Sequence, residues 1–193
     1  MSNINVVRAE HLLNNAGLTS ALDHFERFNR QHPLYTRNYS LNIVSLVHDI
    51  SLLTASKVIS NDLLVSALFL RMVCNVNDYQ IKQALSSANV FLGAHTVRLN
   101  PAKVISYMAD QETNFAPLSN PGMTLHDAEV LTFLQQPASV IVDYAQKRTG
   151  RTRDDTISSL TQIAMSQRMY TRMGRLMLNA IGPDVIRALQ GAS

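Results

Sequence analysis

The chain has 193 residues, a formal net charge of +3 and a hydrophobic fraction of 46%, which together suit one folded domain of ordinary size. Its single cysteine, Cys74, excludes an intrachain disulfide and a zinc site built on paired cysteines, and indicates a reducing, cytoplasmic setting. No run of about 18 apolar residues occurs, and the N-terminal residues lack the charged-then-apolar order of a signal peptide. We therefore expect no membrane association.

In chain order, the first half of the sequence reads as consecutive helices. Gly17 suits the left-handed position just past a first helix, and Pro33 closes a second. A third helix should run over about residues 38–55. Residues 63–85 then form an apolar helix, a polar turn and a further helix, and apolar side chains recur there at the three- and four-residue spacing of a buried helix. Cys74 is expected to be buried in this region.

The second half begins with a clear helix start. Asn100 followed by Pro101 predicts an N-cap with proline at the first helical position. Residues 111–123, with two prolines and a glycine, form the longest predicted loop. Thr124 and Asp127 match an acidic variant of the capping box, so the next helix is expected to begin at Thr124.

Two further helices are predicted before the C-terminus. One covers residues 139–148, and a long one runs from about Asp154 until it breaks or ends near Gly174 or Gly182-Pro183. No segment shows the alternation typical of a strand. The sequence therefore predicts an all-α fold, a single compact helical bundle domain of about eight to ten helices over residues 1–193.

The positive charge is concentrated at the C-terminal end. Residues 1–146 hold nine Lys and Arg against eleven Asp and Glu, whereas residues 147–193 hold eight against three. Such a basic helical segment indicates an anionic partner, such as a phosphate group, a nucleotide or a nucleic acid, or else a solvated helix face. The candidate anion-binding residues are Lys147, Arg148, Arg151, Arg153, Arg168, Arg172 and Arg175.

The last three of these arginines are spaced to form one stripe on a predicted helix. No nucleic-acid recognition signature accompanies them. Elsewhere the chain lacks a phosphate-binding glycine loop, a dinucleotide turn, a paired-histidine zinc motif and a nucleophile elbow. The sequence motifs of these common enzyme classes are therefore absent.

Several segments, in their order and spacing, resemble the small bacterial HD-superfamily proteins known as predicted metal-dependent phosphohydrolases. That family carries a Y-H-x-x-x-H-I segment, an A-x-W-F-H-D-x-x-Y-D motif about 30 residues later, an N-E-x-x-S-A helix, a D-A-D-L segment, a Y-A helix and a closing R-x-x-L-Y-x-T. The corresponding segments here are 35–41, 67–76, 78–84, 108–110, 143–145 and 167–172. The resemblance implies an HD-like helical domain.

Members of this superfamily hold a divalent cation through one histidine, an adjoining His-Asp pair and a distant aspartate, and the metal-bound water attacks phosphorus. The first histidine corresponds here to Ser40, or to Tyr39 in a register shifted by one residue. The His-Asp pair corresponds to Arg71 and Met72, and the distant aspartate to Asp110. Arginine and methionine are not ligands for a hard cation, so the resemblance implies a degenerate site without a metal cofactor.

A relic pocket of this kind can be used in two ways. Arg71 can pair with Asp110 and replace the metal structurally, or it can bind the phosphate of a ligand in the old pocket. In either case we expect a pseudoenzyme that acts by binding, with a protein partner, a second copy of the chain, a nucleotide or a nucleic acid as its partner.

An alternative hypothesis is that the chain is catalytically active. His48 and Asp49, with Asp110 and either His24 or His32, supply the residue types of an HD centre in another register. The chain would then be an active phosphohydrolase that acts on nucleotides with a divalent metal such as Mn or Mg.

Overall fold

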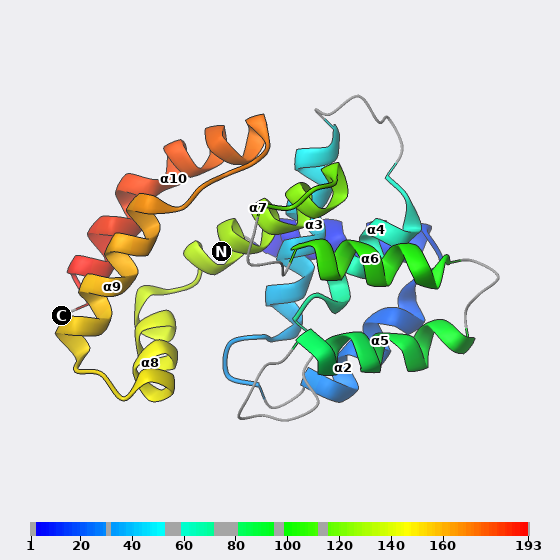
Figure 1. Ribbon diagram of the computed structural model, residues 1–193, viewed down its shortest axis with the longest axis horizontal. Coiled ribbons are helices and arrows are strands. Elements are labelled where there is room, and N and C mark those ends of the chain that lie inside the picture. The colour runs from blue at the N-terminus through cyan, green and yellow to red at the C-terminus, as the bar shows by residue number, and fades with distance from the viewer. Residues whose placement is uncertain are drawn as a thin grey trace.

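The computed structural model describes residues 3–29, 32–52, 59–71, 81–94, 99–111 and 116–192, and within these ranges every regular element is a helix. The all-α prediction is confirmed. The helices are α1 (Asn3–Asn15), α2 (Thr19–Asn29), α3 (Arg37–Leu52), α4 (Asn61–Phe69), α5 (Ile81–Ala94), α6 (Pro101–Gln111), α7 (Asn120–Leu134), α8 (Ala138–Thr149), α9 (Arg153–Ser166) and α10 (Arg172–Gln190). They form a single helical domain (Figure 1).

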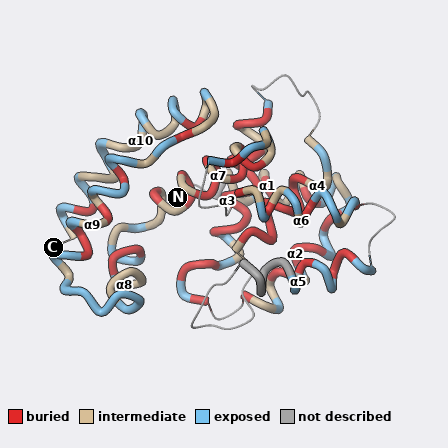
Figure 2. The backbone as a smooth tube through the Cα atoms, viewed as in Figure 1, coloured by how far each residue is buried: buried red, intermediate tan, exposed pale blue. Residues whose placement is uncertain are grey.

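Helices α3 and α7 form the centre of the domain. Helix α3 packs against α1, α4 and α7, and α7 packs against α3, α4, α6 and α10. Both helices are buried along most of their length, as expected for helices with neighbours on several sides (Figure 2). Helix α7 thus joins the group α1–α6 to the layer of α8, α9 and α10, which lies to one side of the molecule in Figure 1.

Local signals placed several helix ends correctly. Gly17 adopts φ +68° between α1 and α2, a conformation that glycine reaches without strain. Pro101 is the first residue of α6, and Asn100 Oδ1 accepts a hydrogen bond from Lys103 N at 3.2 Å. These two predictions depended on residues within one turn of the helix end, and both are confirmed.

The predicted start of α7 is wrong. Ser119, not Thr124, caps this helix, because its Oγ accepts the hydrogen bond from Gly122 N at 3.1 Å. Thr124 and Asp127 lie inside the helix and are buried. Thr124 and Asp127 therefore match the capping-box pattern in sequence but do not cap a helix, since α7 begins at Asn120.

The long C-terminal helix is also divided differently from the prediction. Helix α9 ends at Ser166, and α10 begins at Arg172 with Thr171 as its N-cap. Gly174 therefore lies in the first turn of a helix, and Gly182-Pro183 lies within α10 without ending it. The start of α10 at this place is held by Asp127 on α7, which accepts hydrogen bonds from Tyr170 N at 3.0 Å and Thr171 N at 2.7 Å.

In the described part of the chain, none of the helices combines the length and apolarity needed to cross a bilayer. Met72, Cys74 and the turn expected around residues 76–80 lie outside the described residues.

Candidate functional site

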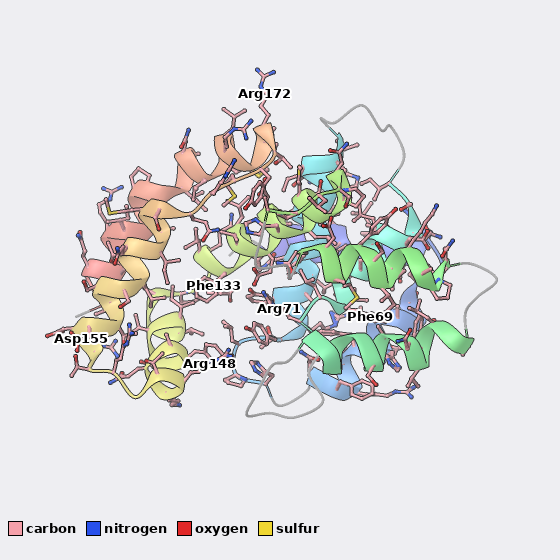
Figure 3. The ribbon with its side chains drawn as sticks, in the orientation of Figure 1. Phe69, Arg71, Phe133, Arg148, Asp155 and Arg172 are labelled. Atoms are coloured by element: carbon pink, nitrogen blue, oxygen red, sulfur yellow. The ribbon has the colours of Figure 1, made fainter. Side chains whose placement is uncertain are left out.

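Arg71, just past α4, Tyr39 on α3 and Glu129 on α7 meet in the interior. Arg71 Nε donates to Glu129 Oε1 at 3.1 Å, and Tyr39 Oη donates to the same oxygen at 2.9 Å. The side chains of Arg71 and Glu129 are each only 12% exposed, and Tyr39 is buried. Figure 3 shows Arg71 in the middle of the molecule, near Phe69. We call Tyr39, Arg71 and Glu129 the core cluster.

Two phenols surround the guanidinium of the core cluster. Arg71 Cζ lies 5.8 Å from the centre of the Tyr35 ring, within the range of a cation–π contact. Burial raises the pKa of Tyr35 far above its usual value, against the opposing effect of Arg71. Burial, and then the Glu129 carboxylate, raise the pKa of Tyr39 in the same direction. Both phenols therefore stay protonated, and Tyr39 acts as a hydrogen-bond donor.

Asn29 and His32 fix the backbone around the cluster. Asn29 Nδ2 donates to Arg71 O at 2.7 Å and to Tyr35 O at 3.0 Å. His32 Nδ1 accepts hydrogen bonds from Leu34 N at 3.2 Å and Tyr35 N at 2.8 Å, and its ring stacks on Tyr35. Burial lowers the pKa of His32 to about 4, so the imidazole is neutral and its Nδ1 can accept.

The structure changes two of the expected assignments. Among the described residues, the carboxylate that pairs with Arg71 is Glu129, which the sequence analysis does not predict as a site residue. Asp110 instead accepts hydrogen bonds from Leu118 N at 2.9 Å, from Ser119 N at 3.0 Å and from the Ser119 hydroxyl. Its role in the described structure is to hold the start of α7.

Of the two residues predicted for the first-histidine position, Tyr39 and Ser40, only Tyr39 contributes to the core cluster. Tyr39 contributes its hydroxyl to the core cluster, whereas Ser40 is fully buried, and its Oγ has no hydrogen-bond partner among the described residues. Met72, the other predicted member of the relic pocket, lies outside the described residues.

The residues of the rival centre have separate surroundings. Arg8 donates to His48 Nδ1 at 2.6 Å and forms an ion pair with Asp49. His24 packs against the rings of Phe28, Phe69 and Phe91, and His32 binds backbone amides as described above. Among the residues that the structure describes, no three His, Cys, Asp or Glu side chains are grouped so as to hold a metal ion.

The core cluster does not fit a divalent metal. An HD-type centre needs imidazole and carboxylate ligands, and the groups that converge here among the described residues are a guanidinium, a phenol and one carboxylate. Arg71 keeps its positive charge at any physiological pH and would repel a cation at this position. The arrangement instead neutralises one buried charge with another and satisfies the acceptor with two donors.

The basic C-terminal residues do not form one stripe. Arg168 lies between α9 and α10 and stacks over the Tyr170 ring, while Arg172 and Arg175 lie on α10. Arg175 donates to the carbonyls of Met169 and Tyr170. The predicted common helix is therefore wrong, because residues 167–170 lie between α9 and α10, outside either helix.

The other predicted basic residues lie at the opposite end of this layer. Lys147 and Arg148 are exposed on the last turn of α8, and Arg151 donates to Ser159 Oγ at 3.0 Å. Arg153 pairs with Asp143 at 2.9 Å. Figure 3 shows Arg148 and Arg172 far apart, so the seven residues do not gather on a single patch.

Sequence reasoning missed Glu129 and Asn29. Glu129 carried one available signal, because a charged residue stands among apolar residues in a predicted helix, as Arg71 does. No comparable local signal marked Asn29. Comparison of the chain with protein-family models, with curated proteins and with solved structures found no match.

Proposed function

We propose that the chain is a non-catalytic HD-like helical domain that acts by binding a protein partner. The observation that carries the non-catalytic part of this proposal is the core cluster, in which Arg71 pairs with Glu129 and Tyr39 donates to the same carboxylate. A cluster of this composition supplies neither a metal-bound water nor an activated nucleophile.

The core cluster agrees with the resemblance to HD proteins only if the distant aspartate is reassigned from Asp110. Residues 127–130 read Asp-Ala-Glu-Val, which is closer to the family's D-A-D-L segment than residues 108–110 are. Under this assignment Tyr39, Arg71 and Glu129 stand for the first histidine, the histidine of the His-Asp pair and the distant aspartate. Three positions far apart in the sequence then meet in space, as the ligands of one site would.

Of the two uses of a relic pocket, the geometry favours structural replacement over phosphate binding. Glu129 already neutralises the Arg71 guanidinium, and both side chains are mostly buried. An incoming phosphate would have to displace this carboxylate and desolvate its own charge. The separation of Arg148 from Arg172 likewise disfavours a continuous nucleic-acid surface.

The first experiment measures hydrolysis. Purified chain is incubated with nucleoside mono- and triphosphates and Mn²⁺, Mg²⁺ or Co²⁺, and released phosphate is measured. We expect no release above a buffer control and no saturable nucleotide binding by calorimetry. Metal-dependent turnover that His48→Ala or Asp49→Ala abolishes would establish the rival centre. Nucleotide binding that is lost in Arg71→Met, while circular dichroism shows that the variant is folded, would establish the phosphate-binding alternative.

The second experiment tests the positive half of the proposal. A protein captured by the tagged chain from cells is purified, and the complex is rebuilt from the two pure components. We expect a saturable one-to-one complex that is insensitive to chelator. Failure of every captured protein to rebind in pure form would contradict a function based on protein binding.

A further inference from the structure

We draw no further inference here: the strongest candidate, the shallow hollow along α9 that Met165 and Gln190 line, carries nothing, because nothing in the structure shows what covers this apolar face.

Discussion

Arg71 and Glu129 depend on each other at the scale of single residues. A buried charge that loses its counter-charge is left desolvated, which typically lowers the free energy of unfolding by about 3–5 kcal/mol. We therefore expect Arg71→Met and Glu129→Gln each to destabilise the chain by that amount, measured by urea denaturation with circular dichroism. The double variant should lose less than the sum of the two single losses.

Tyr39 gives a further test of the core cluster, because its hydroxyl donates to Glu129. Tyr39→Phe removes one donor to a carboxylate and should lower the free energy of unfolding by about 1.5–3 kcal/mol. Tyr107→Phe, at a half-buried position on α6, is the matched control and should change it little. Strictly additive losses for Arg71→Met and Glu129→Gln would show that the pair is not coupled in solution, and the core cluster would then be wrong.

His32 should make stability dependent on pH. Its pKa is lowered by burial to about 4, whereas the unfolded chain titrates near 6.5, so the unfolded state binds the proton first as the pH falls. Stability is unaffected above pH 6.5 and decreases between pH 6.5 and about 4. The loss from this group is at most about 3 kcal/mol for a shift of this size.

The measurement for His32 is urea denaturation at pH 7, 6, 5 and 4. His32→Asn keeps an acceptor for the amides of Leu34 and Tyr35 but does not titrate, so its stability should fall less over this range. His11→Asn, at an exposed position on α1, is the control and should follow the wild type. A His32→Asn curve parallel to the wild type would show that the imidazole is not buried as described.

At the scale of helices, one arrangement occurs twice. An aspartate on another helix accepts hydrogen bonds from the backbone at the start of a helix, and the glycine three residues after the N-cap leaves room for that aspartate. At α7, Ser119 N donates to Asp110, and Gly122 N donates to Ser119 Oγ. At α10, Thr171 N donates to Asp127, and Gly174 N donates to Thr171 Oγ1. In each case the carboxylate also accepts a hydrogen bond from the hydroxyl of the N-cap residue. Its negative charge is further stabilised by the positive end of the helix dipole.

The hydrogen bonds at the start of α7 also lower the pKa of Asp110. Burial by itself raises the pKa of this carboxyl, but the bonds from the Ser119 hydroxyl and from the Leu118 and Ser119 amides outweigh burial and lower it. The contribution of the Asp110 hydrogen bonds to stability is therefore complete above pH 3.8, the ordinary pKa of the group. It is lost as the pH falls through the lower pKa of the folded state.

Gly174→Ala and Gly122→Ala should both be strongly destabilising. A Cβ at these positions would lie 2.2 Å from Asp127 Oδ2 and 2.1 Å from Asp110 Oδ2, so the carboxylate must leave its place and the helix start loses its cap. We expect a loss of about 2–4 kcal/mol for each from overpacking and the lost cap together.

Gly93→Ala is the matched control for both glycines. A Cβ there meets nothing within 4 Å, so the change should be neutral or stabilise α5 by up to about 1 kcal/mol. The measurement is again urea denaturation. If Gly174→Ala behaved like Gly93→Ala, the close approach of Asp127 to α10 would be contradicted.

At the scale of the whole molecule, α7 organises the contacts between the two groups of helices. Its Glu129 reaches Arg71 beyond α4, its Asp127 holds α10, and its own start is held by Asp110 on α6. Helix α7 and its N-cap thus make three polar contacts with other parts of the chain, in addition to the apolar packing of the helix. This explains why nearly every side of α7 is buried and why apolar periodicity alone described it poorly.

The charge of the whole molecule is distributed differently from what the sequence order implied. The excess of Lys and Arg after residue 147 is real. The fold nevertheless separates Arg148 from Arg172 and pairs Arg153 with Asp143. Residues that are close in the sequence therefore do not form one basic patch, because successive helices place them at opposite ends of the α8–α10 layer.

The sequence by itself determined the all-α class and the helix ends at Gly17 and Pro101. These features arise from interactions within a few residues, such as apolar periodicity, capping and restricted backbone conformation, which the local sequence contains. The sequence also marked Arg71 as unusual, since an arginine beside an apolar run requires a counter-charge or solvent.

Only the tertiary structure decided which carboxylate meets Arg71 and where α10 begins. Glu129 is 58 residues from Arg71, and Asp127 is 44 residues from Thr171. Asp110 and Glu129 were equally suitable partners for Arg71 by chemistry. Thr124 and Ser119 were both suitable caps for α7, and only Thr124 has an acidic residue three positions later. The choice between such equivalents depends on how helices pack, because packing determines which side chains come within hydrogen-bond distance.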